Sequence, residues 1–324
     1  MKLLILTLAA LTSLDAAAAA PAAAPAPIRV VVAKDGSGDY PTVQNAVDHA
    51  FDRVLAPTTA RLIIEIRPGI YHERVRVPHD RPRVTFLGQD AQSTIITFAV
   101  GAKDVGGTFF SATVDINADE FEAQNITFEN SYGAGTQAVA ISVHSDRAVF
   151  RNCRFLGMQD TLYAASGRQY YVDSYIAGHV DFIFGNAAAV FDRCEVHSRG
   201  AGYIAAVSRT MPEGAQGFVF THCRLTADPQ VHDVFLGRPW RNYSRVVYLE
   251  CWMDGHIRPE GWNNWNKEAA EQTAWFAESG SDGPGASPPT RVKWAKQLTA
   301  EAARQFRPEV FLRGADGWNP ADAR

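Results

Sequence analysis

Two aspartates in apolar surroundings are the residues of this sequence best suited to chemistry. Asp181 lies in the run GHVDFIFG (178–185), and Asp160 lies in the run GMQDTLY (157–163). An ionised carboxylate among large apolar neighbours is costly unless it is paired. Aspartate is also common in turns, so either residue alone fits a structural role equally well.

An internal repeat predicts that the two aspartates lie side by side. Asp160 follows Cys153 by seven residues and Asp181 follows Ser174 by seven, so both occupy the same position in consecutive repeats. If the repeats stack as strands about 4.8 Å apart, the carboxylates are neighbours. Two like charges at that distance cannot both ionise cheaply, so one keeps its proton at neutral pH. The pair then supplies an acid beside a nucleophile or base.

Arg238 is the candidate partner of the charged aspartate. It lies in the run LGRPW (236–240). A guanidinium can bind a carboxylate through two parallel hydrogen bonds. Most arginines are exposed and solvated, but the flanking glycine, proline and tryptophan favour a fixed position here.

The elements that must position these residues are short strands in a repeating unit. Each strand ends in a small residue, and the steps between those residues are 28, 21, 20, 29 and 28. No single unit can bury its own apolar face, so the units must stack. We therefore expect a right-handed parallel β-helix. A sandwich of short strands would need tight Asn-Gly or Asp-Gly hairpins between the repeats, and the sequence has none there. The aligned residues are Asn125, Cys153, Ser174, Cys194, Cys223 and Cys251.

Short helices are expected to cap both ends of this β-helix. Apolar residues from Val43 to Phe51 recur at helical spacing after Thr42. Thr299 can cap a second helix that extends to Phe306. An end coil without a cap would expose apolar interior and unpaired strand edges.

The N-terminus predicts export. Residues 1–24 read as a signal peptide and the start of an Ala/Pro linker, which leaves 28–324 as one β-helix domain. The apolar run from Leu3 to Leu14 has 12 residues, fewer than the roughly 20 that a membrane-spanning helix needs. We expect a secreted or periplasmic protein without a membrane span.

Composition and motifs exclude several classes of protein. The net charge of −4 argues against a nucleic-acid partner. The sequence has neither a Gly-x-Ser-x-Gly elbow nor a His-Glu-x-x-His pair, so we expect no serine-esterase arrangement, no metal and no cofactor. The four cysteines are too widely spaced for a zinc knuckle. They allow three disulfide pairings or free buried thiols.

Four segments resemble, in order and spacing, the signature segments of pectin methylesterases. They are QAVAI (137–141), QDTLY (159–163), DFIFG (181–185) and LGRPW (236–240). Weaker matches are GIYHE (69–73), FSATV (110–114) and NITF (125–128). The resemblance runs from Val31 to Trp318. It implies a monomeric pectin methylesterase that hydrolyses the methyl esters of homogalacturonan, the methyl-esterified backbone of pectin.

The resemblance also implies a role for each candidate catalytic residue. Asp181 would be the nucleophile, and Asp160 the proton donor that later activates water. Gln137 and Gln159 would form the oxyanion hole, because side-chain amides can donate to a developing negative oxygen. Arg238 would orient Asp181.

The family pattern further places Tyr163, Phe184, Trp240 and Trp262 along the substrate groove, where aromatic faces suit sugar rings. A packing role fits Trp262 equally well. Met158 departs from the pattern, since plant-like members usually have tyrosine there. Three alternatives stay open: a thioesterase of the same family, a β-helix pectate lyase or polygalacturonase, and a non-catalytic carbohydrate-binding β-helix.

Overall fold

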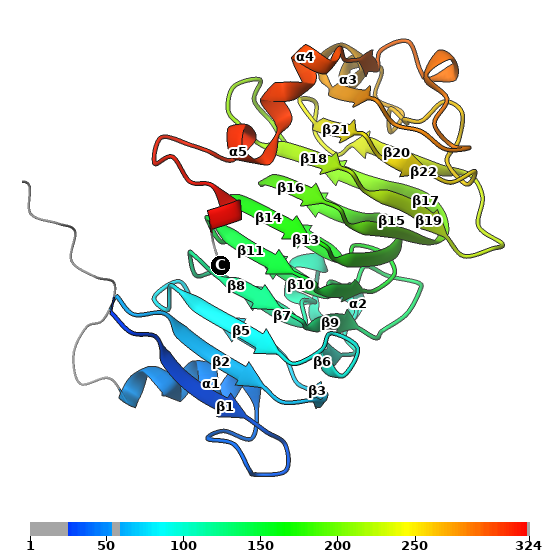
Figure 1. Cartoon of the computed structure of the whole chain (residues 1–324). Helices are drawn as coiled ribbons and strands as arrows, with labels where there is room; N and C mark the ends of the chain where they lie inside the picture. The colour runs from blue at the N-terminus through cyan, green and yellow to red at the C-terminus, as the bar shows by residue number, and fades with distance from the viewer. Residues whose placement is uncertain (1–24, 54–58, 323–324) are drawn as a thin grey trace, which may run out of the picture.

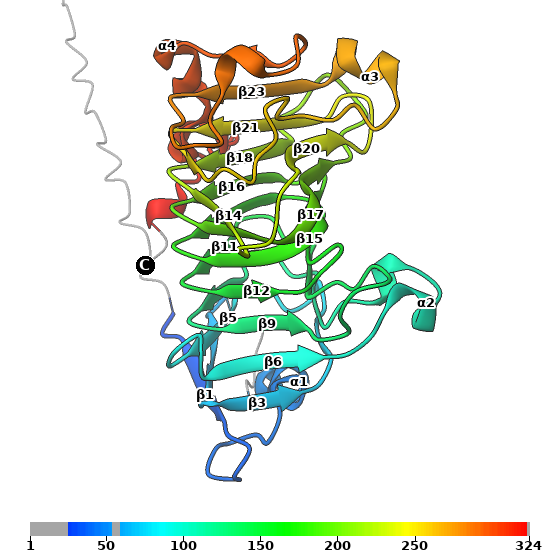
Figure 2. The same cartoon turned by 90° about the vertical axis from the view of Figure 1, so that its right-hand side faces the viewer.

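The computed structural model of this chain describes residues 25–53 and 59–322. Its strands stack in parallel pairs into three columns along one axis (Figures 1 and 2). The first column is an 11-stranded sheet. In stacking order it contains β1 (Ile28–Val32), β2 (Leu62–Ile66), β5 (Val84–Gly88), β8 (Glu122–Gln124), β11 (Ala148–Arg151), β14 (Arg168–Val172), β16 (Ala188–Asp192), β18 (Gly217–Thr221), β21 (Arg245–Leu249), β23 (Trp275–Ser279) and β24 (Lys296–Gln297).

The second and third columns are joined by two long strands, β15 (Tyr175–Gly185) and β17 (Glu195–Val207), each of which pairs in both columns. The second column also contains β3 (Gly69–His72), β6 (Thr94–Phe98), β9 (Thr127–Asn130), β12 (Arg154–Leu156), β19 (Arg224–Ala227) and β22 (Trp252–Met253). The third also contains β4 (Val75–Val77), β7 (Val114–Ile116), β10 (Ile141–Val143), β13 (Leu162–Ala164) and β20 (Val234–Pro239). The predicted parallel β-helix is confirmed.

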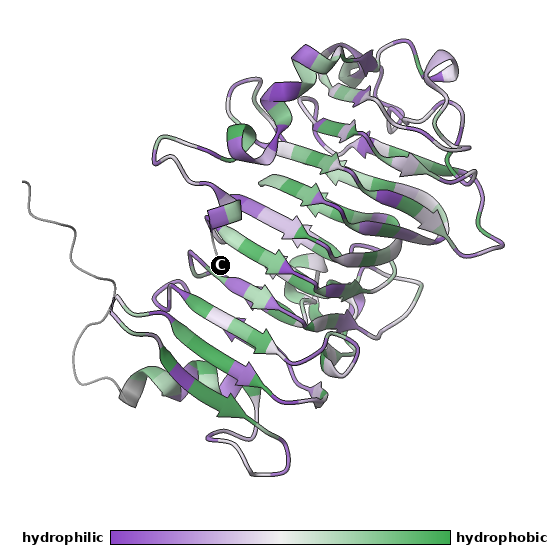
Figure 3. Ribbon diagram, in the orientation of Figure 1, coloured by the Kyte–Doolittle hydropathy of each residue, from purple (hydrophilic) through white to green (hydrophobic). Residues whose placement is uncertain are grey.

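The interior is filled by side chains that stack from coil to coil, and much of the first column is hydrophobic (green in Figure 3). One stack runs through aromatic rings whose centroids are 4.8, 4.7, 4.6 and 4.5 Å apart. This spacing equals the strand separation, so each coil contributes one ring and none could bury it alone. The rings belong to Phe150, Tyr171, Phe191, Phe220 and Tyr248.

From β8 to β21, each strand of the first column is followed by a left-handed residue, and this corner corrects one step of the predicted repeat. Asn125 lies against Asn152, whose Nδ2 donates to Asn125 Oδ1 (2.7 Å), so its partner is not Cys153. The first step is therefore 27 residues, because Ile126 takes the inward position that small residues hold in later coils. The corner residues have φ between 48° and 59° and are Asn125, Asn152, Asp173, Arg193, His222 and Glu250.

The predicted N-terminal helix is present as α1 (Val43–His49), followed by η1 (Ala50–Arg53). Thr42 caps it by accepting from the backbone N–H of Asn45 (3.1 Å). The Glu73 carboxylate accepts from two further N–H groups of its first turn (2.9 Å each). This helix closes the coil that β1 begins (Figure 2).

The predicted C-terminal helix is present as α4 (Ala300–Ala303) and η4 (Arg304–Phe306), and Thr299 caps it. The chain continues through α5 (Pro308–Phe311) and η5 (Pro320–Asp322) along the outer face of the first column (Figure 1). Phe306 and Leu312 are buried against that face. The remaining short helices are α2 (Ala102–Val105), η2 (Thr108–Phe110), α3 (Glu268–Thr273) and η3 (Pro288–Thr290).

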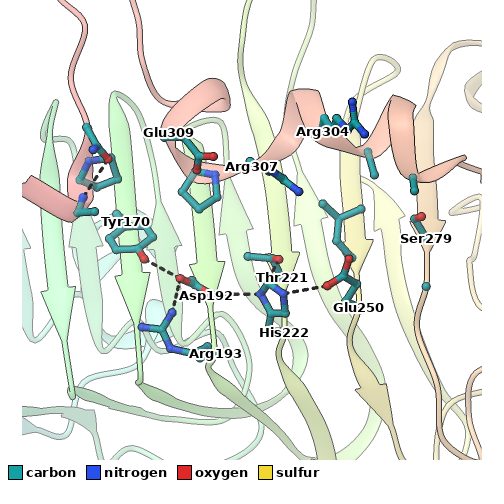
Figure 4. Close-up of a pocket in the computed structure, with 18 of the residues that line it drawn as sticks. Tyr170, Asp192, Arg193, Thr221, His222, Glu250, Ser279, Arg304, Arg307 and Glu309 are labelled. Atoms are coloured by element: carbon teal, nitrogen blue, oxygen red, sulfur yellow. Dashed lines mark hydrogen bonds and ion pairs between the residues drawn. The ribbon is translucent and has the colours of Figure 1, made fainter.

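A cavity of about 720 Å³ lies between this C-terminal segment and the first column (Figure 4). Asp192 accepts from the Tyr170 hydroxyl (2.7 Å) and from Arg193 Nη1 (2.8 Å). Glu250 is bonded to the ring of His222 (2.9 Å). The lining contains none of the predicted catalytic residues.

Across residues 25–53 and 59–322, no helix is both long and apolar enough to cross a membrane. The predicted signal peptide, residues 1–24, lies outside the described part of the chain. The four cysteines are free and buried, and Cys194, Cys223 and Cys251 stack on successive coils.

Candidate active site

Asp160 and Asp181 occupy equivalent positions on adjacent coils. The register that pairs Tyr163 with Phe184 places the two aspartates opposite each other. Both have left-handed backbones, with φ of 63° and 50°, which aspartate tolerates better than most residues. Both are buried, at 9% and 6% exposure. Gly178 leaves room for the chain around Asp181, since a Cβ there would lie only 2.2 Å from that of Phe182.

Arg238, on β20, binds Asp181 through two parallel hydrogen bonds. Its Nε donates to Oδ1 (2.9 Å) and its Nη2 to Oδ2 (2.6 Å). The guanidinium carbon is 3.7 Å from the ring centroid of Tyr203 and 3.6 Å from that of Trp265. We call these two rings the aromatic clamp. By packing on the guanidinium, the clamp fixes the plane in which Arg238 holds the carboxylate.

The surroundings of the two aspartates separate their proton affinities. Burial, and then the charge of Asp181, raise the pKa of Asp160 to about 8, while Arg238 acts in the opposite direction. Burial also raises the pKa of Asp181, but its hydrogen bonds to Arg238 and the charge of that residue oppose the rise. Asp160 therefore keeps its proton at neutral pH, and the bidentate pair makes Asp181 the charged member.

Gln137 and Gln159 lie one above the other and open on the same space as the aspartates. Their backbones form a parallel bridge, and the N–H of Ala138 donates to the carbonyl of Gln159 (3.0 Å). The hydroxyl of Thr136 donates to Oε1 of Gln137 (3.3 Å). With its oxygen engaged, the Gln137 amide presents its N–H groups as donors.

These groups line one hollow of about 230 Å³. The hollow brings together the five predicted catalytic residues with Phe184 and Trp240, while Tyr163 stacks on Phe184 at its edge (centroids 4.7 Å apart). Its polar and aromatic walls can hold a small ester group beside the two carboxyl groups. The lining residues are Thr108, Phe109, Gln137, Gln159, Asp160, Asp181, Phe184, Ala206, Arg238, Trp240 and Trp265.

The assignment of Trp262 to the groove is wrong. Its side chain is 1% exposed and stacks on Phe276 (4.6 Å), and its Nε1 donates to Glu278 (3.3 Å). A backbone bridge to Gly237 directs it into the coil interior. Trp265, three residues later, lines the hollow instead, and the sequence EGWNNW (260–265) gave no means of choosing between the two rings.

Phe109 is a second residue of the hollow that the sequence did not single out. It is 55% exposed, packs at a tilt against Tyr163 (5.1 Å) and stacks on Trp240 (6.4 Å). It lies in η2, in the loop that projects beside α2 (Figure 2). Its position just before the weakly matching segment 110–114 was the available signal.

Within the described ranges, no three His, Cys, Asp or Glu side chains gather in a way that could hold a metal ion. The carboxyl groups of the hollow face amides, a guanidinium and aromatic rings. The arrangement can therefore provide a nucleophile, an acid and hydrogen-bond donors from protein groups alone.

The fold and the hollow define a β-helix protein with a paired-carboxylate site. A family model described as Pectinesterase matches residues 29–315, so the chain belongs to the pectinesterase family. It is 42% identical to Pectinesterase 31 of Arabidopsis thaliana over 87% of this chain and 92% of that protein. It is 41% identical to pectinesterase/pectinesterase inhibitor U1 of Solanum lycopersicum over 88% of this chain, but it spans only 51% of that protein. Carrot pectin methylesterase superposes with a TM-score of 0.85 at 37% identity, over 96% of this chain and 98% of that one.

Proposed function

We propose that this protein hydrolyses the methyl esters of homogalacturonan to free galacturonate carboxylates and methanol. The observation that carries the proposal is the hollow in which a protonated Asp160 lies beside an Arg238-bound Asp181. Family membership supports the same reaction. The hydrolysis of an ester needs a nucleophile, an acid for the leaving group and donors for the oxyanion.

In the first half of the proposed reaction, Asp181 attacks the ester carbonyl carbon through one carboxylate oxygen. The carbonyl oxygen becomes negative and accepts hydrogen bonds from the amides of Gln137 and Gln159. When the tetrahedral intermediate collapses, the bond to the methoxy group breaks and Asp160 gives that group its proton. Methanol leaves, and an anhydride joins the sugar to Asp181.

In the second half, the ionised Asp160 removes a proton from water as the water oxygen attacks the sugar carbonyl carbon. The same two amides stabilise the second oxyanion. The bond to Asp181 breaks, and the regenerated Asp181 carboxylate pairs with Arg238 again. The galacturonic acid then loses its own proton to solvent. Asp160 is then protonated again, so the cycle closes without a metal or cofactor.

Aromatic faces beside the hollow support a sugar polymer as the substrate. Phe109 and Trp240 in its lining and Tyr163 at its edge pack against one another and offer flat apolar surfaces. We further propose that residues 1–24 act as a signal peptide that directs export of the protein, and that the protein acts as a monomer. A thioesterase of the same family would use the same two aspartates on a different acyl group.

The test follows methanol release, polymer length and absorbance of unsaturated sugars together, with purified protein, methylated homogalacturonan and a chelator. We expect methanol at constant polymer length. New unsaturated ends, or shortening without methanol, would instead favour the lyase or hydrolase alternatives, which the sequence left open. Release of thiol from thioesters with no methanol from pectin would favour the thioesterase.

A further inference from the structure

Two arginines, Arg209 and Arg245, meet at a single carbonyl oxygen outside the hollow. Nη2 of Arg209 and Nη1 of Arg245 each donate to the carbonyl of Gly214 (3.4 Å in both cases). Arg209 follows Ala206 of the hollow by three residues and is 4% exposed. Arg245 begins β21 on the neighbouring coil. Two cationic groups are thus held together by a carbonyl of the loop 209–216, which begins with Arg209 itself.

The other partners of these guanidinium groups are neutral. Arg209 donates to the carbonyls of Tyr243 (3.2 Å) and Pro212. The Nε atoms of Arg209 and Arg245 are buried, and neither has a hydrogen-bond partner in the described part of the chain. Buried cations are ordinarily matched by a carboxylate. Glu213 in the same loop is exposed, and neither arginine forms an ion pair with it or with another described residue.

The local backbone is built to admit this pair. At Gly217, with φ of 141°, a Cβ would lie 2.8 Å from that of Arg245, so glycine leaves room for the arginine stem. Burial lowers the pKa of both arginines, and the charge of Arg209 helps to lower that of Arg245 to about 10. Arg245 therefore remains ionised at neutral pH, and Arg209 is opposed in charge only by the exposed Glu213, which raises the pKa of Arg209 against the effect of burial.

We propose that Arg209 and Arg245 form a binding site for a small oxyanion of the carboxylate or phosphate type. Oxygens of one anion can accept from the terminal N–H groups of the two guanidinium groups, in the forked geometry that guanidinium prefers. Binding neutralises the repulsion and fixes the loop 209–216. The backbone N–H of Tyr243 donates to the carbonyl of Arg209 (3.2 Å), so the site adjoins the segment that carries Trp240.

The first test measures thermal unfolding of the whole protein at pH 7 in a cationic buffer, with sodium phosphate, sodium acetate or sodium chloride at matched ionic strength. An anion that binds only the folded state at a hundredfold excess over its Kd raises the Tm by roughly 5 °C in a protein of this size. We expect phosphate and acetate to do so and chloride to do less. An equal rise in Tm with all three salts would show that the salts act only by screening charges, and it would overturn the proposal.

The second test compares three variants, of which Arg245→Met and Arg304→Gln each lose one positive charge. Arg245→Met keeps an apolar stem and should abolish the response to phosphate, while its Tm in anion-poor buffer is retained or raised. Arg304→Gln, on the exposed C-terminal segment, should keep the full response. Arg245→Lys, which lacks the forked N–H groups, should weaken it. A full phosphate response in folded Arg245→Met or Arg245→Lys would show that the pair is not the site. These measurements do not depend on esterase activity.

Discussion

At the scale of single residues, the charged partner of each aspartate, rather than its burial, decides whether it acts as the acid or as the nucleophile. Asp160 and Asp181 share a coil position, a left-handed backbone and nearly equal exposure. Only Asp181 is hydrogen-bonded to Arg238. One guanidinium therefore determines which carboxyl group is ionised, and the other is left to hold the proton.

Asp181→Asn is expected to abolish turnover while leaving the fold intact, because the amide has nearly the same shape but is a poor nucleophile. Asp173→Asn is the matched control, since Asp173 is also left-handed (φ 51° against 50°) but lies at a corner, paired with Arg193. Methanol release and circular dichroism are measured for both. Activity of Asp181→Asn above roughly a tenth of wild type would contradict the assignment of the nucleophile.

The pKa of Asp160, raised to about 8, predicts an alkaline limit to activity. The free enzyme needs Asp160 protonated, so kcat/KM should fall as the pH rises through about 8 and should not fall on this account below it. Initial rates of methanol release between pH 6 and 10, corrected for hydrolysis without enzyme, measure the limit. A profile that stays flat to pH 10 would remove Asp160 from the role of acid.

At the scale of elements, the sequence predicted the positions of residues within the repeating strands. It did not predict the orientation of side chains in the loops between them. Equal offsets of two aspartates within the repeat were enough to place them together, because stacking fixes the register. The loop that carries Trp262 and Trp265 leaves the β-helix, and no periodicity indicates which ring turns inward. The offset at Asn125 was missed because a large apolar residue, Ile126, fills the interior where the later coils have small ones.

These two tryptophans should respond oppositely to the same substitution. Trp265→Ala removes one ring of the aromatic clamp and should lower kcat/KM roughly tenfold, with little change in Tm. Trp262→Ala opens the core and should lower the free energy of unfolding by about 3–5 kcal/mol, while folded molecules keep their activity. Unfolding curves and kinetics are measured on both variants. A loss of turnover in Trp262→Ala together with a loss of stability in Trp265→Ala would contradict the assignment of Trp262 to the core and Trp265 to the hollow.

For the molecule as a whole, the burial of His256 leads us to predict a loss of stability in acid. It is 5% exposed, neither ring nitrogen has a partner among the described residues, and burial lowers its pKa to about 4, against 6.5 ordinarily. The folded pKa is the lower one, so this contribution is complete above about pH 6.5 and is lost as the pH falls towards 4.

Between pH 7 and pH 4.5 the loss amounts to roughly 2 kcal/mol in the free energy of unfolding. Denaturant unfolding of the wild type and His256→Gln at pH 7 and pH 4.5 measures it. The glutamine variant should depend less steeply on pH over this interval. Parallel slopes for the two proteins would mean that other groups account for acid sensitivity.

The hollow is assembled in chain order: Gln137, Asp160 and Asp181 lie on three successive coils, and Arg238 lies two coils beyond Asp181. A coil added before Gln137 would lengthen the molecule and change no distance inside the hollow. A coil inserted between Asp160 and Asp181 would move the acid about 4.8 Å further from the nucleophile. Coils can therefore be added or lost at the two ends of the β-helix, and loops can change in length, without disturbing catalysis. The number of coils between Gln137 and Arg238 is fixed.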